Sequence, residues 1–268
     1  MPVKSGNVTR EDIVMAVRDA VEPLPYVHAF WENGAVSFGR RDRYSDVDAN
    51  LFVDEGMEAK TFEAVEKAIL SLSPISLRYV PKNKELGVSQ TYYRLERADE
   101  FHILDLAIFN PKCPDLYLDP ERNGRAVFHF NKEGGVKVAH LDEAAFSKEV
   151  ADAFERCRAR FEMFNNFVEK EIGRGNPLEA MDYYYSITLF TLLTLLRIRL
   201  NPHHYDFGMR YVYYEPPKRE LDKLERLYFV KDVHDLKVKH SEATAWAKKL
   251  LAAWPPAGSA TRKERTHR

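Results

Sequence analysis

Apolar positions in the first half of the chain change their spacing repeatedly. Between residues 9 and 24 they recur every three or four positions behind Thr9, which suits a helix N-cap, and residues 59–72 repeat that helical spacing. Alternating or continuously apolar runs lie around these two predicted helices, and such runs indicate strands. The predicted strands cover residues 27–33, 47–54, 75–80, 90–97, 101–109 and 125–138, with the last run forming a hairpin that turns at Gly134 and Gly135.

From residue 143 onward the spacing is helical throughout, and it predicts helices over residues 143–175, 176–202, 218–229 and 241–252. The chain is therefore expected to have an α+β fold. A mixed sheet with flanking helices occupies residues 1–142, and an all-α helical bundle occupies residues 143–255. The polar and basic residues 256–268 carry no apolar period and are expected to be a disordered tail.

The composition is that of an ordinary folded protein. Of 268 residues, 45% are hydrophobic and 30% are charged, while the net charge of −1 gives no field that favours nucleic acid or an anionic membrane. The most apolar run, residues 186–196, is too short to cross a bilayer. Cys113 and Cys157 are far apart and follow no ligand spacing, so reduced thiols and a cytoplasmic location are expected.

Three aspartates suggest chemistry. Asp46 and Asp48 stand two positions apart at the start of a predicted strand, so both carboxylates project from the same face. Asp105 lies within another apolar strand, where an unpaired carboxylate is costly. A Mg²⁺ ion, which prefers hard oxygen ligands, would offset this charge. The alternatives are a simple turn for the first pair and a core ion pair with Arg78 or Arg94 for Asp105.

The surrounding motif resembles that of a known superfamily. Gly34 and Ala35, then residues 36–45, then Asp46-Val47-Asp48 are similar to the glycine-serine, spacer and Asp-x-Asp signature of nucleotidyltransferases. The closer likeness is to the branch that modifies aminoglycoside and lincosamide antibiotics. Members carry a third aspartate on a later strand, which Asp105 matches. The resemblance implies a nucleotidyltransferase-type sheet domain followed by a helical domain that binds the acceptor.

The resemblance also implies roles for individual residues. Asp46, Asp48 and Asp105 would be the catalytic and metal-binding carboxylates for one or two Mg²⁺ ions, and ATP is the expected nucleoside triphosphate. Ala35 departs from the usual serine, whose hydroxyl contacts the triphosphate; the loss is worth about 1 kcal/mol. Ser37 could replace that hydroxyl or serve only as a turn residue. The residues expected to bind the nucleotide are Gly34, Ala35, Ser37, Gly39, Arg40, Arg43 and Ser45.

Three functions remain open at this point. The first is transfer of a nucleoside monophosphate to a hydroxyl of a small molecule, such as an aminoglycoside or lincosamide antibiotic, with release of pyrophosphate. The second is the same reaction on a protein or tRNA, although the neutral net charge disfavours nucleic acid. The third is a nucleotide-binding or regulatory module with weakened turnover, which Ala35 favours. No membrane partner is expected, and similar enzymes are commonly homodimers.

Overall fold

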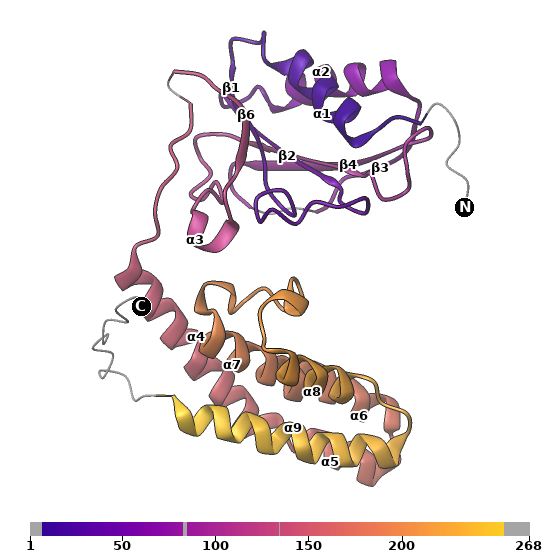
Figure 1. Cartoon of the computed structure of the whole chain (residues 1–268), viewed down its shortest axis with the longest axis vertical. Helices are drawn as coiled ribbons and strands as arrows, with labels where there is room; N and C mark the ends of the chain where they lie inside the picture. Colours follow the sequence, from indigo (N-terminus) through magenta and orange to yellow (C-terminus); the bar gives the residue numbers. More distant parts are fainter. Residues whose placement is uncertain (1–6, 83–84, 134, 255–268) are drawn as a thin grey trace. The chain divides into compact units, whose positions relative to one another are not determined.

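The computed structural model describes residues 7–82, 85–133 and 135–254. The chain divides into two compact units, Met1–Leu141 and Asp142–Arg268. The first combines a sheet with helices and the second is helical (Figure 1). This arrangement confirms the predicted α+β class. The tail predicted at residues 256–268 and the turn residue Gly134 lie outside the described residues.

One mixed sheet forms the centre of the first unit. Its strand order is β3-β4-β5-β2-β1-β6. β2 and β5 are paired in parallel, whereas the other neighbouring pairs are antiparallel. The strands are β1 (Val27–Glu32), β2 (Val47–Val53), β3 (Ile75–Tyr79), β4 (Val88–Leu95), β5 (Leu104–Phe109) and β6 (Val127–Asn131).

Two helices, α1 (Arg10–Val21) and α2 (Glu58–Leu72), cover one face of this sheet (Figure 1). The predicted cap at Thr9 is confirmed, since its side chain accepts the N–H of Asp12 and that carboxylate in turn accepts the N–H of Thr9. Val14 and Val17 of α1 are buried in the same cluster as alternate residues of β2 and β5. Those strand positions therefore point toward the helices, and the residues between them point to the other face.

The predicted hairpin at residues 125–138 is wrong in its second half. Residues 127–131 form β6, which pairs with β1, but residues 135–138 are not in a strand. The Asn131 side chain explains the change, because it donates to the carbonyl oxygen of Val136 (2.9 Å) and accepts the N–H of Val136 (3.1 Å). The returning segment thus bonds to a side chain instead of to a ladder of backbone groups.

The second unit is a helical bundle around α7, which packs against α4 and α9. The helix predicted over residues 143–175 is interrupted at Asn165. The side-chain amide of Asn165 donates to the hydroxyl of Thr244 (2.9 Å), and its oxygen accepts from the hydroxyl of Thr188 (2.7 Å). The main helices are α4 (Glu143–Phe164), α5 (Phe167–Arg174), α6 (Pro177–Tyr183), α7 (Phe190–Leu200), α8 (Lys218–Tyr228) and α9 (Val233–Ala253), with one π-helical segment, Tyr184–Leu189, between α6 and α7.

A buried ion-pair group holds the loop between α7 and α8. Arg197 of α7 pairs with Glu215, and its Nε donates to the carbonyl oxygen of Gly208 at 2.9 Å. His204 binds the other carboxylate oxygen of Glu215. Both charged side chains of the Arg197–Glu215 pair are less than one-tenth exposed. The loop is thereby fixed to α7 by charge-assisted hydrogen bonds.

The substitution Glu215→Gln should destabilise the chain. It leaves the Arg197 guanidinium buried without its countercharge, which costs about 3 kcal/mol or more. Urea denaturation should show this decrease in the free energy of unfolding. The control is Asp222→Asn, which breaks the exposed pair between Lys218 and Asp222 and should have little effect. Equal stability of the two variants would contradict a stabilising role for the buried pair.

Candidate functional site

Parallel pairing brings two of the three predicted aspartates together. Asp48 of β2 lies directly opposite Asp105 of β5 in the register of the sheet. Neighbouring strands are about 4.8 Å apart, so the two side chains stand next to each other. Their strand neighbours Val47, Ala49 and Leu104 are buried in the core under α1 and α2. The two carboxylates therefore project from the face that these helices do not cover.

Asp46 joins this pair from the segment just before β2. It lies two positions before Asp48, and its charge raises the pKa of Asp105, an effect secondary to burial. The structure thus brings all three predicted acids to one end of β2 and β5. Asp46 is exposed, whereas Asp48 and Asp105 are partly buried.

Gly34 lies against the Asp48 carboxylate. Its backbone has a φ of +68°, in the left-handed region, and a Cβ atom built at this position would lie 1.7 Å from Oδ2 of Asp48. Any side chain here would displace the carboxylate. The turn that follows β1 and the Asp48 carboxylate of β2 are therefore in direct contact.

Two residues of β4 surround Asp105. Gln90 Nε2 donates to Oδ1 of Asp105 (2.7 Å) and to the Tyr92 hydroxyl (2.8 Å). Burial raises the pKa of Asp105, although hydrogen bonds from Gln90 and Tyr92 oppose the shift. Burial and the neighbouring charge of Asp105 raise the pKa of Tyr92 to about 12, so its hydroxyl keeps its proton and serves as a donor at neutral pH. The alternative pair of Asp105 with Arg78 is wrong, because Arg78 pairs with Glu66 of α2 (2.9 Å).

A second buried ion pair holds the backbone of Asp46. The Nε of Arg10 donates to the Asp46 carbonyl oxygen at 2.9 Å, and the same guanidinium pairs with Glu32 at the end of β1. Glu32 is also 2.8 Å from Nε2 of His129. Burial alone would raise the pKa of Glu32, but the hydrogen bond of His129 and the charge of Arg10 lower it below its ordinary value. Arg10 thus connects the segment before Gly34 to the segment that carries Asp46.

The serines predicted to bind nucleotide are engaged within the loop. The hydroxyl of Ser37 is buried, 2.9 Å from the carbonyl oxygen of Gly34 and 2.7 Å from that of Asn123. Ser45 is also buried, and its hydroxyl accepts the N–H of Asp42 at 2.9 Å. These contacts favour the turn interpretation of Ser37, and both serines shape the loop that leads into β2.

The remaining predicted loop residues lie in the same turn region. The carbonyl oxygen of Ala35 accepts the N–H of Arg40 at 2.8 Å. Gly39 also has a positive φ, and a Cβ built there would meet no atom within 4 Å. Arg43 is exposed and lies over the ring of Tyr44 at 4.4 Å. Their contact with nucleotide stays a prediction.

The donor set suits an ion that arrives with a nucleotide. Within the described ranges, no three histidine, cysteine or carboxylate side chains gather closely enough to hold a metal ion by themselves. Mg²⁺ in nucleotide sites commonly takes only one or two protein carboxylates, with phosphate oxygens and water as its other ligands. Asp46 and Asp48 fit that arrangement, with Asp105 beside Asp48 and a Gly34 turn that leaves room for nothing larger than hydrogen at the Asp48 carboxylate.

Sequence reasoning missed Gln90, Tyr92 and Arg10. Gln90 and Tyr92 alternate with buried residues along β4, so the two-residue period of a strand places them on the face opposite the helices. This period does not show which residues of other strands they contact. Only the β4–β5 pairing, with Tyr92 opposite Asp105, brings them to the acid group. Arg10 lies at the start of a helix, where a basic residue gives no sign of a buried partner.

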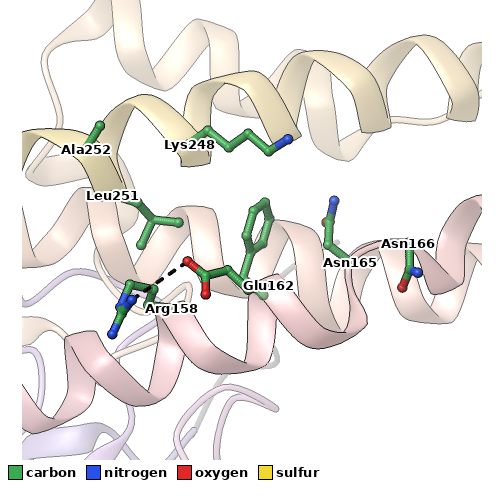
Figure 2. A pocket seen from close by; sticks show the side chains of 8 residues that line it. Arg158, Glu162, Asn165, Asn166, Lys248, Leu251 and Ala252 are labelled. Atoms are coloured by element: carbon green, nitrogen blue, oxygen red, sulfur yellow. Dashed lines mark ion pairs between the residues drawn. The ribbon is translucent and has the colours of Figure 1, made fainter.

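One cavity is found in each of the two units. A groove of about 870 Å³ borders the loop before β2 and includes Arg43, Tyr44 and Phe101, with the last two rings edge-on at 5.1 Å. A cavity of about 590 Å³ lies in the helical unit (Figure 2). There Arg158 pairs with Glu162 at 3.9 Å on α4, and Lys248 extends from the facing helix α9. Neither cavity is lined by any of the three aspartates.

Within the described residues, no helix is both long and apolar enough to cross a membrane. Cys113 and Cys157 are free thiols.

No protein-family model matches this chain, and no curated protein matches its sequence.

Solved structures similar to this chain include two adenyltransferases. One is an aminoglycoside 6-adenyltransferase from Bacillus subtilis, with 15% identity, 92% of each chain covered and a TM-score of 0.30. The other is a spectinomycin adenyltransferase from Enterococcus faecialis with ATP and spectinomycin, with 11% identity, 90% of this chain and 96% of that chain covered, and a TM-score of 0.32. Both names belong to the antibiotic-modifying class that the motif resembles.

The substitution Gly34→Ala should displace the Asp48 carboxylate and weaken Mg²⁺-dependent nucleotide binding on the order of tenfold or more. It should also destabilise the fold by about 1–3 kcal/mol, since alanine is strained at positive φ. Gly56→Ala is the matched control, because Gly56 has a φ of +83° with no atom within 4 Å of the built Cβ. Calorimetric titration with Mg²⁺ and ATP should separate the two variants. Equal loss of binding in both would show that backbone strain alone is responsible.

The substitution Asp105→Asn should change how stability depends on pH in the metal-free protein. Since folding raises the pKa of Asp105, its contribution to stability is present at acidic pH and is lost as pH rises through the folded pKa. The free energy of unfolding of the wild type should therefore fall relative to that of the variant from about pH 4 upward. Urea denaturation across this range measures the difference. Asp19→Asn, at an exposed position of α1, is the control and should follow the wild type.

Proposed function

We propose that this chain is a Mg²⁺-dependent nucleotidyltransferase that transfers a nucleoside monophosphate, with ATP as the expected donor, to a hydroxyl of a small molecule. The observation that carries the proposal is the parallel register of Asp48 and Asp105, with Asp46 beside them and the Gly34 turn against Asp48. A scaffold gains nothing from carboxylates placed side by side, because like charges repel and burial increases the cost.

The reaction is a substitution at the α-phosphorus. The acceptor oxygen forms a bond to the α-phosphorus, the bond from this phosphorus to the bridging oxygen of the β-phosphate breaks, and pyrophosphate leaves. Asp46 and Asp48 would hold Mg²⁺, which when bound offsets the charge of the phosphates and of the leaving group. Asp105, with its raised pKa, is suited to accept the proton of the attacking hydroxyl. Gln90 and Tyr92 orient this carboxylate by hydrogen bonds.

A small acceptor is favoured over a protein or tRNA. The net charge of −1 provides no general attraction for a polynucleotide. The motif resembles that of enzymes that modify aminoglycoside and lincosamide antibiotics, so such an antibiotic is the proposed acceptor. Spectinomycin is bound in one of the similar solved structures, not in this chain. A cytoplasmic location and a homodimer remain predictions.

The test is calorimetric binding of ATP, GTP, CTP and UTP with Mg²⁺, followed by an assay of pyrophosphate release with hydroxylated acceptors. Wild-type protein should bind one triphosphate, and Asp48→Asn should reduce turnover on the order of a hundredfold or more. Mass spectrometry should find the acceptor heavier by one nucleoside monophosphate. Asp19→Asn controls for loss of a surface charge.

Each competing function has its own outcome. Tight triphosphate binding without turnover on any acceptor would indicate a nucleotide-binding module instead of an enzyme. Transfer of label to protein or tRNA would replace the small-molecule acceptor. If no triphosphate binds with Mg²⁺, the nucleotidyltransferase proposal is wrong.

A further inference from the structure

Two tyrosines lie next to the aspartates on the neighbouring strands of the sheet. Asp105 of β5 lies opposite Tyr92 of β4, and Tyr92 lies opposite Tyr79 of β3, the strand at the edge of the sheet. The ring centroids of Tyr79 and Tyr92 are 5.9 Å apart, with an angle of 33° between the rings. Asp48, Asp105, Tyr92 and Tyr79 thus form one row across four neighbouring strands, on the face that α1 and α2 do not cover.

A β-bulge turns the end of β3 toward this face. Ile75 is opposite Leu95 and packs on the helix-covered core, but the register shifts between Ile75 and Leu77. After the shift Leu77 is opposite Arg94 and Tyr79 is opposite Tyr92. Without it, the two-residue period would keep Leu77 and Tyr79 on the face of Ile75. Bulges next to active sites commonly redirect side chains in this way.

The bulge exposes apolar surface instead of burying it. Leu77 is 59% exposed and Tyr79 is 58% exposed. By contrast, the ring of Tyr92 is partly buried, and its hydroxyl accepts a hydrogen bond from Gln90 (2.8 Å) beside Asp105. The partly buried ring of Tyr92, together with the exposed ring of Tyr79 and the exposed Leu77, is suited to contact the apolar face of a ligand ring.

We propose that Leu77, Tyr79 and Tyr92 form the acceptor subsite, which takes a hydroxylated ring against the tyrosines and directs one of its hydroxyl groups toward Asp105. That the bound ring is the acceptor of the transfer reaction rests on the proposed function, whereas the binding of a ring to these side chains does not. The apolar face of the ring lies on Tyr79 and Leu77, and its other polar substituents point away from the sheet.

The order of the strands favours the acceptor over the nucleobase. The Gly34 turn, expected to bind phosphate, contacts Asp48 from the β1 side, and the tyrosines lie on the β4 side of Asp105. In phosphoryl-type transfer the attacking and leaving oxygens are roughly in line on opposite sides of phosphorus. With pyrophosphate on the side of Gly34, the attacking hydroxyl arrives from the side of Tyr92 and Tyr79.

The experiment measures ring binding without nucleotide. Spectinomycin and 2-deoxystreptamine, two hydroxylated ring compounds, are titrated into the full chain and the dissociation constants are determined by NMR. The variant Tyr79→Ala should weaken binding about three- to tenfold, as expected for the loss of one ring contact. Tyr79→Phe keeps the ring and should retain wild-type affinity. Leu70→Ala, at an exposed position of α2 on the other side of the sheet, is the control.

A second titration with Mg²⁺ and ATP separates the occupants. The proposal expects the affinity for ATP to be unchanged in Tyr79→Ala and, with an acceptor that turns over, a raised KM for that acceptor. Weakened ATP binding with unchanged ring binding would assign the tyrosines to the nucleobase and overturn the proposal. Equal ring binding by wild type and Tyr79→Ala, or no ring binding by the wild type, would also overturn it. If Tyr79→Ala loses ring binding but the wild type binds no triphosphate, the subsite stands and the nucleotidyltransferase proposal fails.

Discussion

The parallel pairing of β2 with β5 is the constraint on which the rest of the site depends. It sets Asp48 opposite Asp105, so two carboxylates stand side by side where their charges repel. The register of β2 and β5 is stabilised by the opposite face of the sheet, where alternate residues of both strands are buried under α1 and α2. A slip by one residue would move these apolar side chains out of the core and the acids into it. Hydrophobic burial on one face thus stabilises an unfavourable charge arrangement on the other.

Hydrogen bonds and close packing fix the position of the acids. Gln90 and Tyr92 hold Asp105 by hydrogen bonds. Arg10 forms an ion pair with Glu32, and its contact with Asp46 is a hydrogen bond to the backbone carbonyl oxygen. Gly34 leaves the Asp48 carboxylate its space. The edge of the same sheet presents Tyr79, so one face of the sheet carries both carboxylates and an exposed aromatic ring.

Local patterns predicted most elements because each element buries one face. The period of α1, with its cap at Thr9, and the apolar strands around Asp48 and Asp105 followed directly from the sequence. The failures occurred where a polar side chain competes with the backbone. Asn131 bonds to the segment that would have formed a second hairpin strand, and Asn165 bonds to two other helices where a single long helix was expected. Such bonds join residues whose partners are not visible in a local pattern.

The sequence by itself determined the class of fold, the three acids and the glycine-bearing turn, because spacing along a strand or helix decides which side chains share a face. It could not determine which strands are neighbours. Only the tertiary structure placed Asp105 beside Asp48, and Gln90 and Tyr92 beside Asp105. Only the bulge in β3 brought Tyr79 to the same face. Pairing between distant strands depends on how all the buried faces fit together, and that information is distributed over the whole chain.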